Sequence, residues 1–123
     1  MRCTGILVVP LESSSAPSWF HHPKAFLRVV EQNLVDLRPW YLMDHDQVVT
    51  RMQGLRLRYP GRELVPFARR DDNDDVACWE KDRGEAVVVI HDFASAGHEE
   101  RRVLPDFWSW FRGAVEDMIE FEP

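Results

Sequence analysis

The sequence predicts an α+β fold in which helices flank a central antiparallel sheet. Three observations lead to this prediction. Apolar residues recur at helical spacing in the segments 23–37 and 44–58. Short runs rich in β-branched and aromatic residues follow between 64 and 91, and helical spacing returns from Pro105. Strands that follow one another closely in the chain pair antiparallel. The 123 residues fit one domain over 1–123.

The first helix is expected from Pro23 to Leu37. Proline suits the first helical position, and Pro39 is expected to end the helix. Five apolar side chains at spacings of three or four form one stripe: Phe26, Leu27, Val30, Leu34 and Leu37. Before this helix, the apolar run Ile6–Val9 is interpreted as a short strand.

The second helix is expected to begin after Asp44. Asp44 suits the N-cap, and Gln47, three residues later, completes a capping-box pattern. The helix should end before the turn signal Tyr59–Gly61. Its apolar face is formed by Val48, Val49, Met52 and Leu55.

Three strands are expected after this helix, at 64–67, 76–80 and 86–91. Pro66 lacks a backbone donor, so it predicts an edge strand or a strand start. The second and third strands are joined by a short turn that contains Gly84, which predicts a hairpin. Residues 94–102 are interpreted as a polar loop.

The last element is expected to be an aromatic-rich helix over 105–119. One apolar stripe contains Phe107, Trp110, Phe111, Ala114 and Met118. A stripe this rich in aromatic side chains is usually core, so the helix should pack on the inner face of the hairpin.

The charge of the chain is divided unevenly. Residues 1–70 carry ten basic and six acidic side chains, whereas residues 71–123 carry five basic and fifteen acidic ones. An acidic half repels phosphate, which argues against nucleic acid as a direct ligand. The same charge favours a basic protein partner, and a merely solvated acidic face is the alternative interpretation.

The densest acidic feature is the segment 71–75, which contains Asp71, Asp72, Asp74 and Asp75. Its spacing partly matches a calcium-binding loop, but Val76 stands where that loop needs glycine, and strands rather than helices flank it. A turn between two strands is the preferred interpretation, because Asp and Asn bond to their own backbone. No metal site and no cofactor are predicted.

Little else in the sequence indicates catalysis or a membrane. There is no nucleophile elbow, phosphate-binding loop or zinc-ligand spacing. The two cysteines, Cys3 and Cys78, are interpreted as ordinary thiols, although the sequence alone leaves a disulfide open. No apolar run is long enough to span a bilayer or to form a signal-peptide core. A cytoplasmic protein without enzymatic activity is therefore expected.

One segment resembles a known family. Residues 58–79 (RYPGRELVPFARRDDNDDVACW) combine an apolar strand containing Pro-Phe, an acidic turn and a second strand ending in an aromatic residue. An apolar strand ending in His91-Asp92 and a closing helix that starts at 106–111 (DFWSWF) follow. This order is similar to that of the SUKH superfamily of Smi/Knr-like proteins. The resemblance covers about residues 44–118, and residues 1–40 match the family poorly.

The resemblance implies a bacterial immunity protein that neutralises a polymorphic or contact-dependent toxin, often a nuclease. A regulatory or scaffold protein is the second hypothesis, and a small metal protein or enzyme is the third. The expected binding surface consists of Asp71, Asp72, Asp74 and Asp75, joined by Glu99 and Glu100 from the later loop. Trp79 is the candidate for its exposed aromatic anchor, and the alternative is that strand alternation points Trp79 into the core. In a meander, the turn before 76–80 and the loop after 86–91 emerge at the same end of the sheet, which would make one patch.

Overall fold

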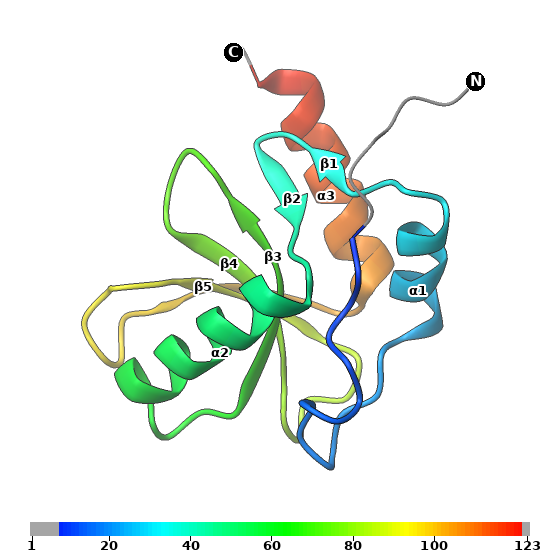
Figure 1. The fold of residues 1–123 in the computed structure, drawn as a ribbon. Helices are drawn as coiled ribbons and strands as arrows, with labels where there is room; N and C mark the ends of the chain where they lie inside the picture. Colours follow the sequence, from blue (N-terminus) through cyan, green and yellow to red (C-terminus); the bar gives the residue numbers. More distant parts are fainter. Residues whose placement is uncertain (1–7, 122–123) are drawn as a thin grey trace.

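The computed structural model describes residues 8–121, and six strands and three helices lie within this range (Figure 1). In chain order they are α1 Lys24–Glu31, β1 Asp36–Leu37, β2 Trp40–Leu42, α2 His45–Arg58, β3 Leu64–Arg70, β4 Asp75–Glu80, β5 Val87–His91, β6 Glu100–Leu104 and α3 Phe107–Glu120. The strands form one antiparallel sheet whose spatial order is the chain order, β1 to β6. This confirms the predicted α+β class.

Two layers of helix cover the sheet. Figure 1 shows α2 in front of the sheet and α3 behind it. Successive side chains of a strand point to opposite faces, so Cys78 and Trp79 of β4 belong to different layers. The ring of Trp79 packs against Phe26 of α1 and stacks on Phe67 of β3, with centroids 5.2 and 4.2 Å apart. The aromatic core therefore lies on the face shared by α1 and α3.

The C-terminal helix packs on the sheet as expected. Asp106 caps it by accepting a hydrogen bond from the backbone N–H of Ser109 at 2.8 Å. Trp110 is fully buried and meets Trp40 of β2 and Phe67 edge to face. Met118, however, is 38% exposed, so the buried stripe is shorter than expected.

The hairpin and the capping box are confirmed. Trp79 pairs with Val87, and Asp75 pairs with His91, in an antiparallel β4–β5 ladder. The side chain of Asp44 accepts from the Gln47 N–H at 3.1 Å, and the Gln47 side chain accepts from the Asp44 N–H at 3.0 Å.

The prediction of one helix over Pro23–Leu37 is wrong, because α1 ends at Glu31. Asn33 takes a left-handed backbone conformation with φ of 59°. The N–H groups of Asn33 and Leu34 then bond to the carbonyls of Val30 and Val29, which closes the helix in a Schellman motif. Leu34 consequently lies outside the helix and is 43% exposed. The chain turns instead into the β1–β2 hairpin, which the sequence analysis missed.

Two further expectations about strands are wrong. The strand containing Pro66 is internal, between β2 and β4, because a register shift between Pro66 and Ala68 accommodates the missing donor. Part of the expected polar loop 94–102 is the edge strand β6. Of the expected strand Ile6–Val9, Ile6 and Leu7 lie outside the described residues, and Val8 and Val9 belong to no strand.

Candidate functional site

In the acidic segment 71–75, residues 71–74 form the turn between β3 and β4, and Asp75 is the first residue of β4. The side chain of Asn73 accepts a hydrogen bond from the Asp75 N–H at 2.8 Å, which is the predicted bonding of a turn residue to its own backbone. Asp72 is clamped by Arg70, with Nε–Oδ1 and Nη2–Oδ2 distances of 2.8 and 2.9 Å. These bonds hold the pKa of Asp72 below its ordinary value. Asp71 lies 3.6 Å from Arg38, and both side chains are well exposed.

Asp74 and Asp75 differ in their surroundings. Asp74 is exposed, and within residues 8–121 its carboxylate forms no ion pair. Asp75 lies 2.8 Å from His91 Nδ1 and 3.3 Å from Arg101 Nε. Asp74 is therefore the carboxylate of this turn most accessible to a partner.

The turn and the loop after β5 meet at one end of the sheet, as expected. The backbone N–H of Asp92 donates to the carbonyl of Asp74 at 2.9 Å. The N–H of His91 donates to the carbonyl of Glu99 at 2.7 Å. The backbones of the two acidic segments are thus close, although their side chains diverge.

Glu99 and Glu100 are both paired with arginines, and Glu100 remains exposed. Glu99 is only 6% exposed and lies 3.0 Å from Arg62 Nε. Glu100 binds Arg62 Nη2 at 2.7 Å and Arg83 Nη2 at 3.3 Å. The hydrogen bond from Arg62 is the main cause of a pKa of Glu100 below its ordinary value. Both carboxylates are therefore occupied by arginines of the chain itself.

The prediction that Trp79 is an exposed anchor is wrong. Its side chain is 2% exposed and packs in the aromatic core. The alternation of side chains in β4 points Trp79 toward α1 and α3. Trp79 is buried there because both faces of this internal strand are covered.

The exposed aromatic at this end of the sheet is Phe93, which the sequence analysis did not single out. Phe93 is 62% exposed and has a φ of 67°, a conformation that is unfavourable by roughly 1–2 kcal/mol for a residue with a side chain. Two contacts hold it there. Its N–H donates to Asp92 Oδ1 at 2.8 Å, and the guanidinium of Arg58 lies 4.1 Å from the ring centroid.

Asp92 is the polar centre of the site. Its carboxylate is fully buried and accepts hydrogen bonds at 2.7 Å from Nε and Nη2 of Arg58 and from Nη1 of Arg51. Burial opposes its ionised form, but the bonds from Arg58 and Arg51 outweigh burial, so the pKa of Asp92 lies below its ordinary value. The sequence does contain one indication of this cluster, because Arg51 and Arg58 are seven residues apart and therefore lie on one face of α2.

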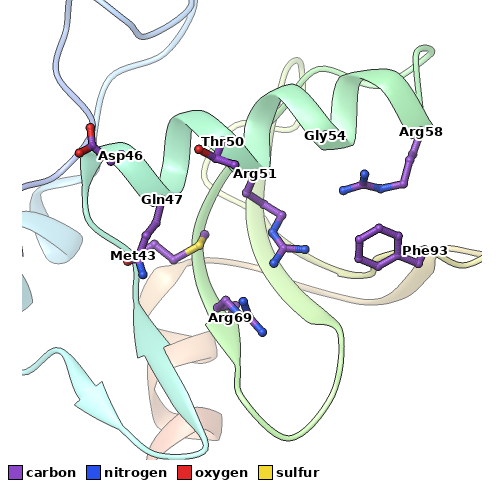
Figure 2. Close-up of a pocket in the computed structure, with 9 residues that line it drawn as sticks. All are labelled: Met43, Asp46, Gln47, Thr50, Arg51, Gly54, Arg58, Arg69 and Phe93. Atoms are coloured by element: carbon purple, nitrogen blue, oxygen red, sulfur yellow. The ribbon is translucent and has the colours of Figure 1, made fainter.

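A pocket of about 550 Å³ opens beside this cluster (Figure 2). Arg51 and Arg58 of α2, Arg69 of β3 and Phe93 supply its charged and aromatic walls. Figure 2 shows Arg58 above the ring of Phe93, and Arg51 reaching down from α2 toward the level of Arg69. Gly54 also lines the pocket, and a β-carbon there would lie 2.6 Å from Arg58 Nη2. The glycine therefore leaves the space in which Arg58 reaches Asp92.

The described part of the chain gives little support to metal binding, to a reactive thiol or to a membrane-spanning helix. No group of three or more His, Cys, Asp or Glu side chains in residues 8–121 is arranged to hold a metal ion. Cys78 is a free thiol that is completely buried, and burial raises its pKa. Cys3 lies outside the described residues. None of the helices in the described range is long and apolar enough to cross a membrane.

Comparison of the chain with models of protein families, with curated proteins and with solved structures finds no match. The site therefore has to be interpreted from its own geometry.

Proposed function

We propose that this chain is a protein-binding module, and that it acts in the cytoplasm as an immunity protein that neutralises a toxin domain. The more specific part of this proposal derives from the resemblance to SUKH proteins over about residues 44–118. The site itself supports the more general part, since its residues suit recognition of a protein surface.

The observation that carries the proposal is the position of Phe93 beside the acidic turn. Binding energy at protein interfaces concentrates in a few aromatic and arginine side chains that are surrounded by polar groups. Phe93 is 62% exposed and held in place by Arg58, and the loop that carries it bonds to Asp74 through the backbone of Asp92. Because the ring is already ordered, a partner would lose little conformational entropy in binding it.

The charge of the turn favours a basic partner. Asp71 and Asp74 are exposed, and the pair that Asp71 forms with Arg38 is a surface pair of small energetic value. Asp72 is neutralised by Arg70 and contributes less. Carboxylates at the rim of an interface mainly increase the association rate and set its salt dependence. Toxin nucleases tend to be basic, which agrees with this surface.

The proposal is tested first by the genes adjacent to the one for this chain. A large toxin gene immediately upstream would support immunity and would supply the partner. The toxic domain of that gene should then bind the chain, and co-expression of the chain should protect cells from it. If the partner instead proves to be a cellular protein with no toxic activity, the chain is a scaffold or regulator.

Two variants test the surface. Phe93→Ala should weaken binding about tenfold or more, whereas Asp71→Lys with Asp74→Lys should slow association and reduce its salt dependence. Ile119→Ala is the matched control, because Ile119 is 67% exposed on α3, behind the sheet. Equal affinity of the Phe93 variant and the wild type would show that the partner docks elsewhere.

A further inference from the structure

The three arginines of the pocket are not fully neutralised by the chain. Asp92 is the carboxylate that pairs with Arg51 and Arg58, and it occupies one nitrogen of the first and two of the second. Within residues 8–121, Arg69 forms no ion pair, and its Nε bonds only to the carbonyl of Arg70, at 3.4 Å. Asp46 is a second carboxylate of the pocket wall, at the start of α2. Each guanidinium carries five N–H donors, so most donors of the three remain available.

Two of these arginines, Arg51 and Arg58, are also fixed in position. The buried carboxylate of Asp92 ties both to the end of β5, and the absence of a side chain at Gly54 lets Arg58 lie along the helix. Arg51 and Arg58 have side chains that are 16 and 30% exposed. An ordered cation near the surface binds an anion at a lower entropic cost than a free surface arginine does.

The remaining walls suit a small organic molecule. Gln47 and Thr50 offer neutral polar groups, and Met43 and Phe93 offer apolar surface. Arg58 lies over the Phe93 ring, yet the residue remains 62% exposed, which leaves ring surface for a planar group. A volume of about 550 Å³ lies within the usual range of small-molecule pockets, which is roughly 300–1,000 Å³.

We propose that this pocket binds a small phosphorylated molecule, with the phosphate between Arg51 and Arg69 and a planar group against Phe93. Arginine suits phosphate because its planar fork donates two parallel hydrogen bonds. An extended nucleic acid is disfavoured, since the acidic turn bonds directly to the loop that carries Phe93 and would repel further phosphates. This inference does not require the protein partner proposed above, although both proposals use Phe93.

The experiment is a titration of the purified chain with inorganic phosphate, phenyl phosphate and acetate at constant ionic strength. The side-chain Nε–H signals of the arginines are followed by NMR. Phosphate should shift the signals of Arg51 and Arg69 in a saturable manner and leave that of Arg56 unchanged, because Arg56 is exposed on α2 outside the pocket. Phenyl phosphate should bind more tightly than inorganic phosphate, and acetate more weakly.

Variants then assign the site. Arg69→Gln should weaken phenyl phosphate binding about tenfold or more, since it removes charge-assisted hydrogen bonds, and Arg56→Gln should leave it unchanged. Phe93→Leu should bring phenyl phosphate down to the affinity of inorganic phosphate. The proposal is overturned if phosphate concentrations up to about 20 mM cause no saturable shift. A dissociation constant of about 20 mM corresponds to a binding free energy of only about 2 kcal/mol. Equal losses in Arg56→Gln and Arg69→Gln would also overturn it, as they would show general attraction by surface charge. The NMR titration of the wild type decides the matter even if a variant fails to fold.

Discussion

At the residue scale, Asp92 connects the fold to the site. Its side chain joins α2 to the end of β5 through Arg51 and Arg58, and its backbone N–H joins that end to the acidic turn through Asp74. The same carboxylate accepts from the N–H of Phe93 and so helps to hold the left-handed backbone there. Asp92 therefore organises a helix and an exposed aromatic ring through its carboxylate, and a turn through its backbone.

Asp92→Asn should lower the free energy of unfolding by about 2–3 kcal/mol at neutral pH. The substitution removes hydrogen bonds to charged groups, and the cost is below that of a fully buried pair because both arginines reach solvent. Urea unfolding measures it. Asp74→Asn is the matched control, since this exposed carboxylate should change stability by no more than about 0.5 kcal/mol.

The wild type and Asp92→Asn also test how the contribution of Asp92 to stability depends on pH. The pKa of Asp92 is lower in the folded than in the unfolded state, so its contribution is complete above the unfolded value, near 3.9, and is lost as the pH falls through the folded value. The stability difference between the wild type and Asp92→Asn should therefore shrink below about pH 4. A difference that stayed constant down to pH 2 would contradict an ionised Asp92.

The effects of substitutions at Gly54 and Arg58 on stability should depend on each other. Glycine inside a helix is about 1 kcal/mol less favourable than alanine, but a β-carbon at position 54 would displace the Arg58 guanidinium from Asp92. Gly54→Ala should therefore give little or no gain in the wild type and a gain of about 1 kcal/mol when Arg58→Ala is already present. Urea unfolding of the four proteins measures this, and an equal gain in both backgrounds would show that the glycine does not serve Arg58.

At the element scale, the sequence predicted the helices and strands whose signals are local. The capping box of α2, the β4–β5 hairpin and the aromatic helix α3 were found because each combines periodic burial with a clear start or end. The end of α1 was missed, although Asn33 is a residue type that favours the left-handed C′ position. The edge strand β6 was missed because its four exposed residues, Glu100 to Val103, show no apolar alternation.

The aromatic helix provides the stability test at this scale. Trp110→Ala should lower the free energy of unfolding by about 3–5 kcal/mol, because the residue is fully buried against Trp40 and Phe67. Trp108→Ala, on the same helix and 38% exposed, should cost distinctly less. Chemical unfolding of both variants makes the comparison, and similar losses would mean that α3 packs through a different face.

At the scale of the whole molecule, the pairing of charges and the burial of side chains are the features of the site that the sequence could not predict. The acidic segment was recognised, and the meeting of its backbone with the loop after β5 followed from antiparallel topology. Which carboxylates remain accessible depended on arginines that are distant in sequence, such as Arg62 for Glu99 and Glu100. The orientation of Trp79 depended on whether β4 is covered on both faces. Such long-range pairings leave no local pattern.

The centre of the sheet should open only when the whole molecule unfolds, and Cys78 can report this. It lies in β4, between β3 and β5, and its thiol is completely buried with a raised pKa. A thiol reacts as the thiolate and needs contact with solvent, so in a Cys3→Ser background iodoacetamide should modify Cys78 only in unfolded molecules. The free energy derived from the labelling rate should then agree with that from urea unfolding to within about 1 kcal/mol.

The control for this measurement is a thiol at an edge of the same sheet. Val103 of β6 is 44% exposed, so in a background without Cys3 and Cys78, Val103→Cys should react nearly as fast as a free thiol. If Cys78 were labelled at a free energy several kcal/mol below that of global unfolding, β4 would be opening locally. The central strands would then be less cooperative than their continuous burial implies.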